Sequence, residues 1–128
     1  GMTVTEQPDT FTRSVRDVAA ESGVASSAVR FYEQHGVLTA VRTAGDQRRF
    51  DDSAACRIRV AKVAQRVGLT VREIAGIFAA LPADPGPQDW GRVAETLIAE
   101  AEARTAALRA HLTEMRGGGR LCEIEPAH

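Results

Sequence analysis

Arginine and small hydroxyl side chains gather in the first half of the chain at spacings that suit a polyanionic partner. Ser26 and Ser27 open a predicted helix, and the free N–H groups at a helix start bind phosphate well. Arg30 follows one turn later and can reach a phosphate or the acceptor edge of a guanine. The pattern predicts contact with duplex DNA by Arg16, Ser26, Ser27, Arg30, Tyr32, Arg42, Gln47, Arg48 and Arg49.

Plainer roles stay open for three of these residues. Tyr32 can instead be partly core, Arg49 can face away from DNA, and Arg30 can be simply solvated. Residues 13–72 carry eleven Lys or Arg against six Asp or Glu. Residues 73–128 carry five against nine, so the formal net charge of −1 conceals a basic first half. This distribution favours a nucleic-acid partner for the first half, with chance variation as the alternative.

Two short helices joined through a glycine are expected to position this chemistry. Ser14 and Asp17 form a capping box that starts the first helix, and Gly23 ends it. The second helix is expected from residue 25 or 26 to about residue 35, with Gly36 as its stop. Such a pair is typical of a helix-turn-helix.

A small two-stranded wing and two further helices are expected next. Residues 37–50 have extended character on both sides of a turn that Gly45 is expected to supply. A longer helix should follow, and a capping box of Thr70 and Glu73 should open another helix that reaches about Leu81. The apolar stripe that this last helix should place in the core is Val71, Ile74, Ile77, Phe78 and Leu81.

A long uninterrupted helix is predicted over about residues 88–116, after a proline-rich linker at 82–87. Its apolar residues alternate at spacings of four and three for nearly three heptads, which is the pattern of a coiled coil. At ~1.5 Å per residue the helix reaches roughly 40 Å, more than the preceding domain can easily cover. Pairing with a second copy is therefore favoured over folding back onto its own domain. The predicted dimer interface is Ala94, Ile98, Ala101, Thr105, Leu108, Leu112 and Met115.

The predicted fold class is mainly α: a winged helix-turn-helix DNA-binding domain followed by a long C-terminal coiled-coil dimerisation helix. The composition, with 44% hydrophobic and 26% charged residues, is that of an ordinary globular chain. The expected division is a disordered tail at 1–12, the DNA-binding domain at 13–81, the linker at 82–87, the dimerisation helix at 88–116 and a second tail at 117–128.

Composition disfavours several classes of protein. No apolar run approaches the ~18 residues of a membrane span, and no secretion signal is visible. The two cysteines, Cys56 and Cys122, favour a reducing, cytoplasmic location over a disulfide scaffold. We expect no enzymatic activity, because no nucleophile–base pair, phosphate-cradling glycine loop or metal cluster is apparent.

The chain resembles the MerR family of bacterial regulators in the segments RSVRDVAAESGVASSAVRFYEQHGVL, RTAGDQRRF and AQRVGLTVREI. Within that family, AGDQRRF, AQRVG and the spacing of Leu81, Pro82 and Trp90 are most similar to the SoxR branch. The resemblance covers about residues 13–115. It implies an antiparallel coiled-coil homodimer on a pseudo-palindromic operator between the promoter elements. It further implies that the effector-bound dimer bends and untwists an overlong spacer, so that RNA polymerase can engage both elements.

The chain departs from the SoxR branch in its last residues. That branch carries four cysteines, in a C-x2-C-x-C-x5-C run that holds a [2Fe–2S] cluster, whereas MRGGGRLCEIEPAH contains Cys122 alone. One thiol cannot supply a four-thiolate site, so we expect no iron–sulfur sensing and no cofactor. An unknown effector is expected near Phe78, Trp90 and Cys122, with hinge packing as the alternative for the two aromatic residues.

Other roles stay open for the cysteine and for the whole chain. Cys122 could bind a metal with His111 or His128, act as a redox thiol, or be incidental, and no metal site is predicted. An architectural, excisionase-like DNA-bending protein without an effector is the alternative to a promoter-binding regulator. The long dimer helix favours the regulator.

Overall fold

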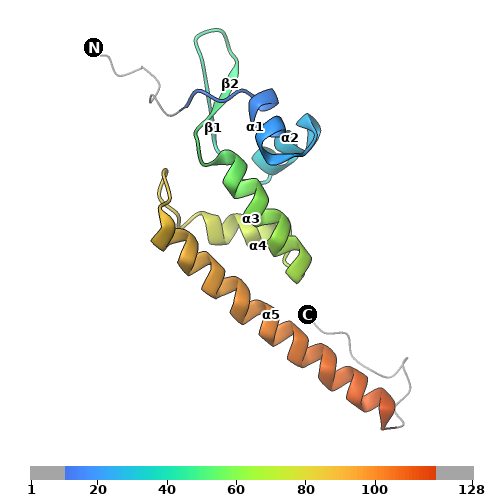
Figure 1. Cartoon of the computed structure of the whole chain (residues 1–128). Coiled ribbons are helices and arrows are strands. Elements are labelled where there is room, and N and C mark those ends of the chain that lie inside the picture. The colour runs from blue at the N-terminus through green and yellow to red at the C-terminus, as the bar shows by residue number, and fades with distance from the viewer. Residues whose placement is uncertain (1–10, 118–128) are drawn as a thin grey trace.

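A computed structural model describes residues 11–117 of the chain and places five helices and a two-stranded sheet in them. The compact part of the fold comes first along the chain, and a long helix then extends away from it (Figure 1). The elements in chain order are α1 (Val15–Ser22), α2 (Ser26–Gln34), β1 (Ala40–Arg42), β2 (Arg48–Phe50), α3 (Ala54–Val67), α4 (Val71–Phe78) and α5 (Pro87–Arg116).

Both predicted capping boxes are confirmed. The Ser14 hydroxyl accepts from the Asp17 N–H at 3.1 Å, and the Asp17 carboxylate accepts from the Ser14 N–H at 3.0 Å. Thr70 and Glu73 exchange the same pair of hydrogen bonds at the start of α4. The boxes satisfy backbone donors that the first turn of a helix leaves unpaired, so they fix where α1 and α4 begin.

The wing forms as predicted, and Gly45 lies in its turn, although the left-handed position falls on the next residue. β1 and β2 pair antiparallel, with Ala40 opposite Phe50 at the base of the wing. The left-handed residue of the turn is Asp46, at φ 62°, and not the glycine beside it. Short acidic side chains tolerate this conformation, and the Asp46 N–H bonds the Thr43 carbonyl at 2.9 Å.

The segment before β1 belongs to the core, although the sequence suggests that the wing begins there. Val37 and Leu38 are buried, and both of their N–H groups bond the Tyr32 carbonyl near the end of α2. Gly36, at φ 84°, makes this turn possible because glycine adopts positive φ without a steric penalty. The first strand is therefore displaced to Ala40.

One hydrophobic core joins the compact elements. Val18, Val29, Phe50, Ile58 and Ile74 are fully buried and come from α1, α2, β2, α3 and α4. The predicted stripe of α4 is confirmed, since Ile74 and Phe78 are buried and the remaining three residues pack partly against the core. α4 itself ends at Phe78, short of the predicted Leu81.

Only the first part of α5 packs against this core. Val93 and Leu97 are buried in it, whereas Ile98, Leu108 and Leu112 are between 56% and 61% exposed. The C-terminal part of the helix runs clear of the domain (Figure 1). The alternative of a helix folded back on its own domain therefore applies to the first part of α5 and not to the whole helix. None of the helices in residues 11–117 is both long and apolar enough to cross a membrane.

Candidate nucleic-acid interface

The starts of α1 and α2 and the wing surround one open, mainly polar hollow of about 560 Å³. α1 and α2 are consecutive helices, the wing follows later in the chain, and packing against the common core brings all three together. Six of the nine predicted DNA-contacting residues lie here. The hollow is lined by Ser14, Val15, Arg16, Ser26, Arg30, Asp46, Gln47, Arg48 and Arg49.

The start of α2 offers the anion-binding geometry that the sequence predicts. The N-cap residue, Ala25, makes no side-chain capping bond, so it leaves the first N–H groups of α2 without a side-chain acceptor. Ser26 is the first residue of the helix, and Arg30 is exposed one turn later. This arrangement places backbone donors, a small hydroxyl residue and a guanidinium on the same side of the hollow.

The arginines of the wing are held in place by their neighbours. Arg48 Nε lies 2.8 Å from the Glu33 carboxylate, which ties β2 to the last turn of α2. The two groups are not aligned for a regular hydrogen bond, so the contact is mainly one between charges. Arg49 donates to the side chain of Gln47 at 2.8 Å and to the Arg48 carbonyl at 3.1 Å. These contacts restrict how the wing can present its charge.

Arg42 and Ser27 do not line the hollow. Arg42 pairs with the Asp46 carboxylate at 3.0 Å across the turn of the wing. Ser27 is exposed at the start of α2, on the neighbouring side of the helix.

Tyr32 packs in the core and does not line the hollow. The side chain is buried, and its hydroxyl donates to the amide oxygen of Gln65 on α3 at 2.7 Å. Burial raises the pKa of the phenol. The hydroxyl therefore links α2 to α3, which is the plainer role that the sequence left open.

Two residues that hold β2 in place were not predicted from the sequence. Glu33 holds Arg48 across fifteen positions of sequence, a separation that no helix or hairpin periodicity marks. Arg13 joins the segment before α1 to β2 through two backbone hydrogen bonds with Phe50, at 2.7 and 3.0 Å. Its side chain also pairs with Glu21 and Asp52. Such long-range pairs follow from the tertiary fold and leave no local signal.

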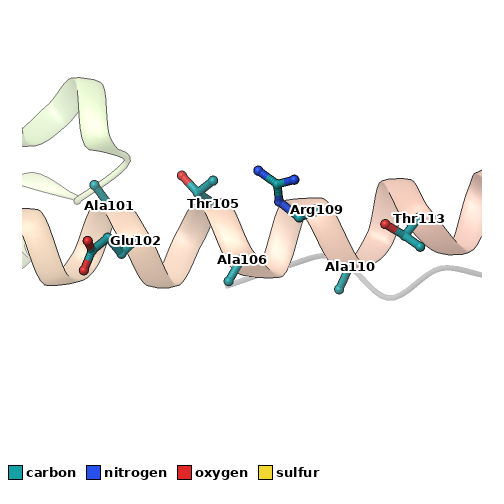
Figure 2. Close-up of a pocket in the computed structure, with 7 residues that line it drawn as sticks. All are labelled: Ala101, Glu102, Thr105, Ala106, Arg109, Ala110 and Thr113. Carbon is teal, nitrogen blue, oxygen red and sulfur yellow. The ribbon is translucent and has the colours of Figure 1, made fainter.

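The predicted coiled-coil seam lies on a face of α5 beside the one that packs on the domain. Ala94 and Ile98 each follow a core residue, Val93 and Leu97, by one position, so the two faces adjoin on the helix. Figure 2 shows that several side chains farther along are short, among them Ala101 and Thr105 from the seam, with the longer Glu102 and Arg109 between them. Short side chains permit close approach of a second helix.

The aromatic residues proposed as an effector region pack against each other where α5 starts beside α4. The rings of Phe78 and Trp90 are 5.8 Å apart in an edge-on contact, and Phe78 is buried. Arg57 lies over the Phe78 ring and donates to the Pro82 carbonyl, and burial lowers the pKa of its guanidinium. These contacts match the alternative role of hinge packing. Cys122 lies outside the described residues.

Metal binding has no support in the described part of the chain. Residues 11–117 contain no group of three or more His, Cys, Asp or Glu side chains placed to hold an ion. Cys56 is a free, partly buried thiol on α3.

Two family models match the chain. The one described as the MerR HTH family regulatory protein matches residues 13–81, and the one described as MerR, DNA binding, matches residues 56–117. The chain is 36% identical over 86 residues to a HTH-type transcriptional activator SoxR homolog of Chromobacterium violaceum, covering 66% of this chain and 58% of that relative. It is 32% identical over 98 residues to the HTH-type transcriptional regulator HmrR of Sinorhizobium medicae, covering 75% and 67%. The chain therefore spans less than two thirds of the first relative.

A solved structure has the same fold. It is that of HiNmlR, a MerR family regulator lacking the sensor domain, bound to promoter DNA, and it aligns with a TM-score of 0.53 at 19% identity. The alignment covers 83% of this chain and 86% of that one. The first family match spans more than half of the chain and contains every element that lines the hollow. The chain belongs to the MerR family of helix-turn-helix regulatory proteins, a family of transcription regulators and not of enzymes.

Proposed function

We propose that this chain binds promoter DNA as a homodimer and regulates transcription there, with the hollow as the DNA-reading surface of each protomer. One observation carries the proposal: a single polar hollow is lined by Arg16, Ser26, Arg30, Arg48 and Arg49. A recognition helix flanked by a basic wing can place one element in the major groove while the other contacts the backbone beside it.

The exposed seam of α5 supports the homodimer. Ile98, Leu108, Leu112 and Met115 are large apolar side chains that stay exposed in the isolated chain. An apolar row at heptad spacing is the pattern that a second helix covers. A two-fold dimer presents two copies of the hollow, which suits two half-sites of a pseudo-palindrome.

Regulation is proposed to act through the shape of the promoter. The dimer would bend and untwist an overlong spacer, so that RNA polymerase meets both promoter elements in register. In this proposal the protein works in the cytoplasm, responds to an effector yet to be identified, and does not use iron–sulfur redox sensing. The family match and the names of the relatives as transcriptional regulators support the regulatory role.

Binding to DNA selected from a random duplex pool tests the function. We expect the selected sites to be inverted repeats and the complex to contain two chains. Arg30→Ala should weaken binding by ~1–3 kcal/mol if the guanidinium contacts a base. Arg92→Ala is the matched control, because Arg92 pairs with Asp89 on α5, away from the hollow.

The outcome separates the two candidate classes. Selected inverted repeats bound by a dimer support the promoter regulator. A monomer that bends its site would favour the excisionase-like alternative. Equal affinities for Arg30→Ala, Arg92→Ala and the unaltered chain would contradict the assigned DNA surface.

A further inference from the structure

Three contacts along one face of α5 hold this helix against its own domain. Val93 and Leu97 are buried in the core, and Arg104 follows two turns later on the same face. The Arg104 side chain is only 22% exposed, which is unusual for a charged group on a helix that stands largely clear of the domain. Its burial indicates a defined partner on the neighbouring helices.

That partner is the corner between α3 and α4. Gly68 ends α3 at φ 115°, a conformation that favours glycine, and a Cβ placed there would lie 3.2 Å from Arg104 Nε. The same Cβ would lie 3.3 Å from Arg104 Cδ, so the side chain passes directly over the glycine. The corner has no room for a larger residue unless the arginine moves.

Beyond Gly68 the guanidinium meets two carboxylates. It lies 3.8 Å from Glu73 at the start of α4, and it also pairs with Glu100 one turn back on α5. Glu73 is itself fixed, because its carboxylate accepts the Thr70 N–H at 2.8 Å in the capping box. Arg104 thus links α5 to a point that cannot move without breaking the start of α4.

We propose that Arg104 is a positioning residue that sets the angle between α5 and the DNA-binding domain. This inference rests on the proposed function, in which two domains attached to paired α5 helices each read one half-site. If the seam fixes the paired helices, the angle at which each domain leaves its helix decides how far apart the two hollows lie. Arg104 then determines which half-site separation the dimer prefers.

The preference for half-site separation tests the proposal on the full chain. The probes are duplexes whose two selected half-sites are moved apart in steps of one base pair. The unaltered dimer should favour one separation. Arg104→Ala should reduce its affinity ratio for the best over the adjacent separation by about threefold to fivefold, which corresponds to the loss of one partly exposed ion-pair contact. Affinity for a single half-site should stay unchanged.

Matched variants separate positioning from general damage. Arg104→Lys retains the charge and should recover part of the ratio. Glu73→Gln keeps an acceptor for the Thr70 N–H while removing the charge that faces Arg104, and should reproduce the loss in part. Arg92→Ala removes an arginine of the same helix that pairs within α5, and should behave as the unaltered chain. A spacing profile unchanged by Arg104→Ala, or altered equally by Arg92→Ala, overturns the proposal.

A measurement without DNA distinguishes failure of this inference from failure of the proposed function. Spin labels at Ala20→Cys on α1 and Ala110→Cys on α5, in a Cys56→Ala and Cys122→Ser background, report the angle within one chain diluted with unlabelled protein. We expect a narrow distance distribution that broadens in Arg104→Ala and not in Arg92→Ala. Equal widths would sink the positioning role even if DNA binding is as proposed. If the chain binds no paired site but Arg104→Ala still broadens the distance distribution, the positioning role stands and the proposed function fails.

Discussion

At the scale of single residues, the arginines of the hollow fall into two kinds. Arg30 is exposed one turn into α2, whereas Arg48 is held by Glu33 and Arg49 by Gln47. A held arginine enters a complex with less conformational freedom to lose, and it presents its charge from a fixed place. In the proposed complex, the wing would therefore contribute to DNA binding through its position relative to α2 as well as through its charge.

The contact between Arg48 and Glu33 should be measurable as a coupling energy. We expect a double-mutant cycle of Arg48→Ala and Glu33→Ala in thermal unfolding to give ~0.2–1 kcal/mol, because the pair is partly exposed and screened. Strictly additive effects would show that the wing is not braced through this pair.

Tyr32→Phe tests the placement of the tyrosine in the core. Removing the hydroxyl deletes its hydrogen bond to Gln65, and we expect the free energy of unfolding to fall by about 0.5–1.5 kcal/mol. DNA affinity should stay at the level of the unaltered chain. A large loss of affinity with unchanged stability would return Tyr32 to the DNA-contacting set.

At the scale of elements, two capping boxes fix the helices that bound the hollow and the α3–α4 corner. Hydrogen bonds from the Ser14 backbone, and then from its hydroxyl, lower the pKa of Asp17. The Thr70 backbone N–H lowers the pKa of Glu73 in the same way, with a smaller contribution from the nearby Arg104. Each carboxylate thus stabilises the folded state in its charged form.

The sign of the resulting pH dependence follows from these directions. A carboxyl group whose pKa is lower in the folded state adds stability above its unfolded pKa, and that stability is lost as pH falls through the folded pKa. We expect the melting temperature to drop as the pH falls from about 5 to about 2, and the drop to be smaller in Asp17→Asn and Glu73→Gln. Thermal melts across this range measure it. An equal drop in both variants and in the unaltered chain would contradict the role of the boxes.

At the scale of the whole molecule, one part of α5 packs on the domain and another leaves large apolar side chains exposed. Its first turns bury Val93 and Leu97 in the domain, and its remaining length exposes Leu108 and Leu112 on the adjoining face. A monomer cannot cover both faces with one small domain. Assembly and DNA geometry are therefore linked through one helix in the proposed dimer.

Leu108→Glu should break the proposed dimer. A charge placed in the apolar seam must be buried or the helices must separate, so we expect sedimentation to report a monomer at micromolar concentration. Ala103→Glu introduces the same charge at an exposed position off the seam, and should remain dimeric. A tight dimer of Leu108→Glu would show that α5 pairs through another face.

Local sequence by itself determined the starts of α1 and α4, the identity of the core stripe on α4 and the long apolar periodicity of α5. Capping and helical periodicity act over three to seven positions, so they can be seen in the chain without knowledge of its fold. The same local logic misplaced the start of β1 and did not identify the left-handed position in the turn of the wing. Val37 is drawn into the core by the end of α2, and the left-handed position falls on Asp46.

Only the tertiary structure determined which side chains line the hollow, which are buried and which pair with each other. It gathered Arg16, Arg30 and the wing into one hollow, and it withdrew Tyr32 into the core. It also paired Arg48 with Glu33 and brought Arg104 onto the corner at Gly68. These relations join positions separated by fifteen to more than thirty residues, where no periodicity links the partners. These relations arise because amphipathic helices pack on a common core. Once the buried faces are in contact, the direction of each exposed face is set.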